Sequence, residues 1–128
     1  MDAIIFTGLY ASEKRRFIAS IRNQPFQNLI IDICQFFNIS VEDMKSKSRL
    51  GKVVKCRHVV SFILYLNTPL TLKSIGEHVG NRDHSTIIHS IDLVKDLMEY
   101  NKGFREKIQE LKDFLENEKN YKKIYLAK

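Results

Sequence analysis

Four polar residues, Asp83, His84, Ser85 and Thr86, stand next to one another in the sequence, and an apolar stripe begins at Ile87. Capping a helix needs only one such residue, because a single Asp, Ser or Thr side chain accepts hydrogen bonds from the first free N–H groups. Several of them in one exposed first turn can also hydrogen-bond base edges or phosphates in the major groove of DNA. The run therefore predicts either a capped helix with solvated neighbours or the first turn of a DNA recognition helix.

The positive charge of the chain gathers close to this run. The chain has 128 residues and a formal net charge of +6. The segment from Lys45 to Ser90 contains eight basic and two acidic residues, whereas thirteen basic residues balance thirteen acidic ones elsewhere. Its first part, Lys45 to Arg57, contains six cations and no acid. Such a run repels itself and gains from an anionic partner, which predicts binding to nucleic acid or, alternatively, to acidic lipid or an acidic protein.

Metal, nucleotide and thiol chemistry find little support in the sequence. His84 and His89 lie about 140° apart around a helix, and no CxxC or HxxxH pair occurs, so we expect no metal site. No GxxxxGK[ST] phosphate loop is present, which predicts no ATP binding, no cofactor and no enzyme activity. Cys34 lies in an apolar stripe, Cys56 lies on the basic helix, and two cysteines make no disulfide framework. Without a signal peptide or a membrane span, we expect a cytoplasmic protein associated with the nucleoid.

The spacing of the apolar residues predicts an all-α fold, a multi-helix bundle. Helices are expected over residues 12–21, 26–37 and about 52–67, with a short turn opened by Ser40 between the last two. Thr71 and Asp83 are expected N-caps on either side of the turn signal Gly80-Asn81, so the helices they begin form a helix-turn-helix. The second of these helices should bury one stripe, which consists of Ile87, Ile88, Ile91, Val94, Leu97 and Met98.

Three segments are expected along the chain. Residues 1–25 form an N-terminal extension, expected to be helical, and residues 26–101 form the DNA-binding domain. Residues 102–128 form a C-terminal amphipathic helix and a basic tail, with an apolar stripe of Phe104, Ile108, Leu111 and Leu115. This stripe packs within the molecule or, alternatively, binds a second copy in a homodimer or another protein partner.

The run from Gly80 to Ser90, which is G-N-R-D-H-S-T-I-I-H-S, resembles the signature of the C-terminal DNA-binding domain (domain IV) of the bacterial replication initiator DnaA. The resemblance extends without a gap from about Leu29 to Val94. It implies a Trp repressor-like helix-turn-helix that binds double-stranded DNA at DnaA-box-like sites, in replication initiation or its regulation. A transcriptional, mobile-element or phage regulator with the same fold is the alternative. The ATPase module that precedes this domain in DnaA is not part of the sequence, and the opening Met1 leads us to expect a free-standing small protein unless the chain is an excised fragment.

By position, the resemblance implies that Arg49 enters the minor groove and that the polar run faces bases and phosphates. It places Leu72 against a thymine methyl group and puts three residues, Arg57, His58 and Thr68, at positions that contact the DNA backbone. Arg82 and His89 belong to the signature itself, and Arg82 either contacts DNA directly or braces the turn. The full predicted set of DNA-binding residues is Lys47, Arg49, Lys52, Lys55, Arg57, His58, Thr68, Leu72, Lys73, Arg82, Asp83, His84, Ser85, Thr86 and His89. Five positions depart from the family pattern, namely Leu50, Gly51, Cys56, Lys73 and Leu93, so we expect a changed affinity and sequence preference.

Overall fold

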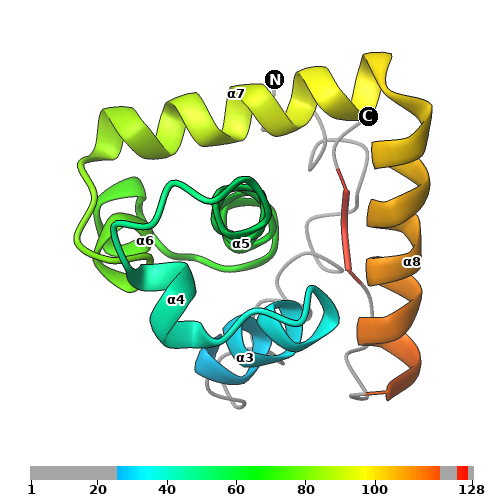
Figure 1. Cartoon of the computed structure of the whole chain (residues 1–128), viewed down its shortest axis with the longest axis horizontal. Helices are drawn as coiled ribbons and strands as arrows, with labels where there is room; N and C mark the ends of the chain where they lie inside the picture. Colours follow the sequence, from blue (N-terminus) through cyan, green and yellow to red (C-terminus); the bar gives the residue numbers. More distant parts are fainter. Residues whose placement is uncertain (1–25, 119–123, 127–128) are drawn as a thin grey trace.

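The computed structural model describes residues 26–118 and 124–126, and all regular structure within these ranges is helical. The helices are α3 (Phe26–Phe36), α4 (Val41–Lys45), α5 (Gly51–Asn67), α6 (Leu72–His78), α7 (His84–Tyr100) and α8 (Lys102–Glu118) (Figure 1). The predicted all-α bundle is confirmed. The helix expected over residues 12–21 lies outside the described residues. No helix in the described ranges is long and apolar enough to cross a membrane.

Helix α5 is the centre of the bundle. It packs against α3, α4, α6 and α7, which surround it in Figure 1. The second half of its sequence is mostly apolar on every side, and from Val59 to Leu64 every residue is buried. A helix that is apolar all round is stable only where neighbours cover it from all directions, which explains its central place. Cys56 on α5 meets Cys34 on α3 at an Sγ–Sγ distance of 3.9 Å, and the expected core position of Cys34 is confirmed.

Helix α7 buries one stripe against α5 and leaves its start in solvent. Ile87, Ile91, Val94 and Met98 are buried, as the sequence predicts, and Leu97 of the same predicted stripe is half-buried. Ile88 is 43% exposed, so its predicted place in the core is wrong. One residue turns a helix by about 100°, which carries position 88 away from the face that its neighbour Ile87 directs at the core.

Helix α8 closes the other side of the core. Its four stripe residues, Phe104 to Leu115, are all buried, and the helix packs against α7 and α3. Asn101 caps it, since its Oδ1 accepts a hydrogen bond from the N–H of Phe104 at 2.9 Å. Beyond it, the main chain of Tyr125 pairs with the Asn67 amide, in which Oδ1 accepts at 2.7 Å and Nδ2 donates at 3.1 Å. The C-terminal stripe therefore packs within the molecule.

The turn between α6 and α7 is tight because two glycines permit it. Gly80 has φ +102° and Asn81 has φ +58°, the left-handed conformation expected of this turn signal. A Cβ at Gly80 would lie 2.2 Å from the carbonyl oxygen of Lys45, and one at Gly76 would lie 2.0 Å from that of Arg82. The approach at Gly80 places the turn against the end of α4, and the approach at Gly76 places Arg82 against α6.

Candidate nucleic-acid interface

The basic loop, residues 46–50, connects α4 to α5 and displays its cations outward. Ser46 and Ser48 are half-buried, whereas Lys47 and Arg49 are exposed. The Ser46 Oγ accepts a hydrogen bond from the Ser48 N–H at 3.1 Å, and the Ser48 Oγ accepts one from the Leu50 N–H at 3.2 Å. The two serines thus replace the backbone partners that a helix or sheet would supply. Sequence reasoning missed their role, although the alternation Ser-Lys-Ser-Arg carried the signal.

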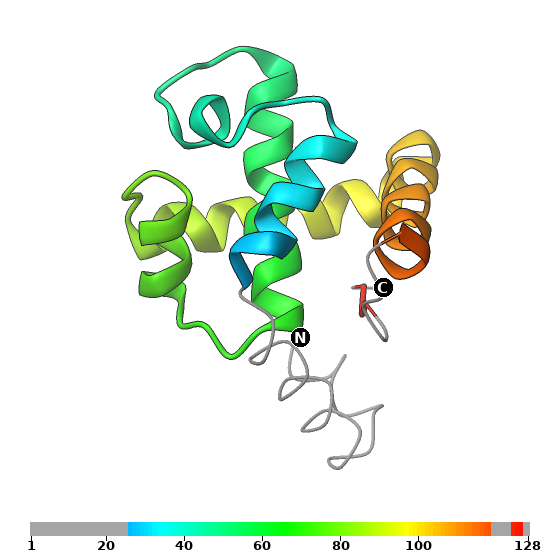
Figure 2. The same cartoon turned by 90° about the horizontal axis from the view of Figure 1, so that it is seen from below.

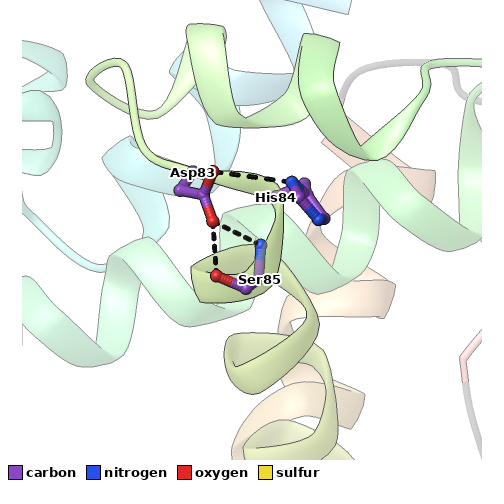
Figure 3. A network of polar contacts seen from close by, with 3 residues as sticks. All are labelled: Asp83, His84 and Ser85. Atoms are coloured by element: carbon purple, nitrogen blue, oxygen red, sulfur yellow. Dashed lines mark hydrogen bonds and ion pairs between the residues drawn. The ribbon is translucent and has the colours of Figure 1, made fainter.

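The recognition turn, residues 83–86, is exposed at every position. The Asp83 Oδ2 accepts hydrogen bonds from the Ser85 N–H at 3.1 Å and from the Ser85 hydroxyl, which confirms the predicted N-cap (Figure 3). The His84 Nδ1 lies 3.5 Å from the Asp83 Oδ1. The hydrogen bonds from Ser85 lower the pKa of the Asp83 carboxyl, so this side chain is an ionised acceptor at neutral pH. The turn therefore offers bases both acceptors and donors.

A shallow cavity of about 740 Å³ joins the recognition turn to the start of α6. Thr71 caps α6, as predicted, by accepting a hydrogen bond from the Ser74 N–H at 3.1 Å. The cavity is lined by Thr71, Leu72, Lys73, Glu77, Asn81, Arg82, Asp83 and His84. The structure thus brings two predicted site residues of α6, Leu72 and Lys73, to the same hollow as the recognition turn.

Three further predicted residues lie along α5 and differ in exposure. Lys52 and Lys55 are exposed near the basic loop. His58 is half-buried, and its Nδ1 lies 2.7 Å from the Ser90 Oγ of α7. Burial, with His89, Arg57 and Arg82 nearby, lowers the pKa of His58, so its ring is neutral at pH 7.

Thr68 is set apart from this group. It is buried just past the far end of α5, where its hydroxyl donates to the Leu64 carbonyl at 2.6 Å. In Figure 2 the basic loop lies at the start of α5, whereas α6 follows the opposite end of α5. The structure therefore does not bring Thr68 together with the basic loop. The Thr68 side chain instead satisfies a carbonyl group in the last turn of α5.

Arg57 and Arg82 are the two predicted site residues whose guanidinium groups turn inward. Arg57 is 7% exposed and Arg82 is half-buried. Both donate to main-chain carbonyl groups at or beside the basic loop. His89, in contrast, is exposed on α7 one turn after the recognition turn.

A tight turn, a capped and exposed helix start and a neighbouring basic loop together define a helix-turn-helix of the DNA-binding class. The family model described as "Bacterial dnaA protein helix-turn-helix" matches residues 27–94, just over half of the chain. The protein belongs to this family.

Curated relatives agree with the family match. The chromosomal replication initiator protein DnaA of Porphyromonas gingivalis strain W83 is 35% identical over 85 residues, which cover 66% of this chain and 18% of that protein. The DnaA of Bacteroides fragilis is 31% identical over 88 residues, 69% of this chain and 18% of its own. That of Crocosphaera subtropica is 32% identical over 103 residues, 75% of this chain and 23% of its own. The chain thus spans about a fifth of the length of these initiators.

Proposed function

We propose that this protein binds double-stranded DNA sequence-specifically, at DnaA-box-like sites, and acts in replication initiation or its regulation. One observation carries the proposal. The exposed recognition turn and the exposed basic loop lie on the same side of α5 in Figures 1 and 2, in a chain of the DnaA helix-turn-helix family. The relatives carry the name of a chromosomal replication initiator, which supports the proposed process.

The recognition turn enters the major groove. Asp83 accepts from a cytosine amino group, the Thr86 methyl group meets a thymine methyl group, and His84 and Ser85 hydrogen-bond base edges or phosphates. Leu72 contacts a second thymine methyl group from across the shallow cavity, with Lys73 beside it. Exposure of all four residues of the turn supports this arrangement, since none is needed to fill the core.

The basic loop lies along the neighbouring backbone and minor groove. Arg49 enters the minor groove, where the negative potential is strongest over narrow AT-rich sequence. Three exposed lysines, Lys47, Lys52 and Lys55, neutralise phosphates on either side, and the exposed His89 contacts the backbone from α7. Phosphate contacts fix the register, and the base contacts of Arg49 and the recognition turn give the specificity.

Selection of bound duplexes from a random pool tests this function. Recovery of a DnaA-box-like consensus supports a role beside the initiator, and a different consensus keeps sequence-specific binding but favours the alternative role as a transcriptional, mobile-element or phage regulator. Recovery of no consensus, together with binding to anionic lipid vesicles, overturns the proposal and favours a basic interaction protein. A parallel titration with ATP should show no saturable binding, because we propose neither a nucleotide cofactor nor catalysis for this chain.

A further inference from the structure

The guanidinium group of Arg57 reaches from α5 into the backbone of the basic loop. Its Nε donates to the Met44 carbonyl at 2.8 Å, and its Nη2 donates to the carbonyls of Ser46 at 2.9 Å and Ser48 at 3.2 Å. At 7% exposed, the side chain is almost completely enclosed. Arg57 therefore donates to three carbonyl groups in or next to the loop, and little of its surface is left to contact DNA.

The guanidinium group of Arg82 reaches the same loop from a different element, the turn between α6 and α7. Its Nη2 donates to the Ser46 carbonyl at 2.7 Å, and its Nη1 donates to the Lys45 carbonyl at 3.4 Å and to the Val79 carbonyl. Ser46 is thus held by two guanidinium groups at one oxygen. The one from Arg57 belongs to the core helix, and the one from Arg82 belongs to the helix-turn-helix.

Burial lowers the pKa of Arg57, and repulsion by the nearby charge of Arg82 lowers it further. All six of these hydrogen bonds from the two guanidinium groups end on main-chain carbonyl oxygens. A planar guanidinium group suits this task, because its five donors point in fixed directions and satisfy several carbonyls at once. Without these donors, the half-buried loop carbonyls would lack partners, since the loop belongs to no helix.

We infer that Arg57 and Arg82 form a clamp that fixes the basic loop against the helix-turn-helix, and that both are positioning residues instead of phosphate contacts. This inference rests on the proposed function for its consequence, whereas the clamp itself concerns the free protein. The clamp sets the separation between Arg49 on the loop and the recognition turn at the start of α7. It thereby couples minor-groove recognition to major-groove recognition, since Arg57 and Arg82 share one acceptor, the Ser46 carbonyl.

The first test needs no DNA. Lys45, Lys47 and Arg49 are tryptic sites in or beside the basic loop, and a loop that opens locally is cut faster. Arg57→Lys and Arg82→Lys keep the charge and the number of tryptic sites but lose the fork of donors. We expect cleavage within the loop to accelerate about tenfold in each variant while circular dichroism shows a folded chain; that factor corresponds to a change of about 1.4 kcal/mol in local opening.

The second test measures how Arg49 depends on the clamp. Binding to duplexes with AT-rich and GC-rich flanks is compared for the parent, Arg49→Ala, Arg82→Lys and the double variant. We expect Arg49→Ala to reduce the AT-flank preference about tenfold in the parent and far less when Arg82 is already replaced, because residues that act through one another are not additive. The slope of log affinity against log salt should stay the same in Arg82→Lys.

Arg105→Lys is the matched control, since Arg105 also donates to main-chain carbonyls, those of Met98 at 2.8 Å and Glu99 at 3.2 Å, at the corner between α7 and α8. It should change neither loop cleavage nor flank preference. Unchanged loop cleavage in both clamp variants overturns the clamp whether or not the protein binds DNA. A second outcome also overturns the clamp. If Arg82→Gln and Arg57→Gln each lower the slope of log affinity against log salt by about one, and the effect of Arg49→Ala stays intact and additive, the two arginines contact phosphates directly. Failure of the parent to bind duplex DNA contradicts the proposed function alone.

Discussion

Two adjacent isoleucines on α7 give the sharpest test of how this helix faces the core. Ile87 is 1% exposed and Ile88 is 43% exposed, although the sequence offers no chemical difference between them. Truncating Ile87 to Ala removes three carbon atoms from a closed core and leaves a cavity, which costs about 2–5 kcal/mol of unfolding free energy. Truncating Ile88 removes atoms that are already partly in water, so we expect about 1 kcal/mol or less, a fraction of the 1.5–3 kcal/mol of full burial.

Urea unfolding followed by circular dichroism measures both variants under the same conditions. The two should share the parent slope against urea and differ in midpoint, because only stability changes. Ile91→Ala, a buried position one turn further along, should behave like Ile87→Ala. Equal losses for Ile87→Ala and Ile88→Ala would refute the facing of α7, and with it the exposure of the recognition turn that this helix begins.

Three further predictions concern the interface. The exposed cations around the basic loop should neutralise about four to six phosphates, which gives a slope of log affinity against log salt of roughly −4 to −5. An affinity that does not change with salt would show that the loop does not lie on DNA. His84→Ala and Asp83→Asn should keep the melting temperature of the parent, since His84 is exposed and Asn caps a helix as well as Asp does. In paired binding titrations, each variant should lose about 1–3 kcal/mol of discrimination against a mismatched site. His58 has a pKa below its ordinary value of 6.5, because burial disfavours the charged ring. Below about pH 6.5 the unfolded chain therefore binds a proton at His58 that the folded chain does not bind, so the free energy of unfolding decreases as the pH is lowered. His58→Gln should make the unfolding midpoint less sensitive to acid.

The helix boundaries and caps could be predicted because their causes are local. Ser40 and Thr71, for example, each accept a hydrogen bond from an N–H three residues ahead, and that geometry is written into the sequence spacing. The recognition turn follows from the same logic, since its cap and its polar neighbours are consecutive.

What the sequence could not provide is where long side chains end. Helical periodicity places Ile87 and Ile88 on the same broad face, and only the position of α5 decides which of them is covered. Arg57 and Arg82 are basic residues of the type that contacts DNA, and the sequence does not show that both donate to the carbonyl of Ser46 in the basic loop. The amphipathic stripe of α8 likewise predicts a buried face without saying that α7 and α3 cover it.

The arrangement of polar groups shows how so small a chain could hold the two DNA-reading elements of the proposed function in fixed positions. A loop with two long cations loses conformational entropy when it binds DNA, and the loss weakens affinity unless the loop is already ordered. Here the ordering is supplied inside the protein, by serine hydroxyls within the loop and by guanidinium groups beneath it. The exposed Lys47 and Arg49 side chains are the parts left to order on DNA. In the proposed function, positive charge is thus divided between outward cations, which would meet phosphates, and inward cations, which donate to the loop carbonyls.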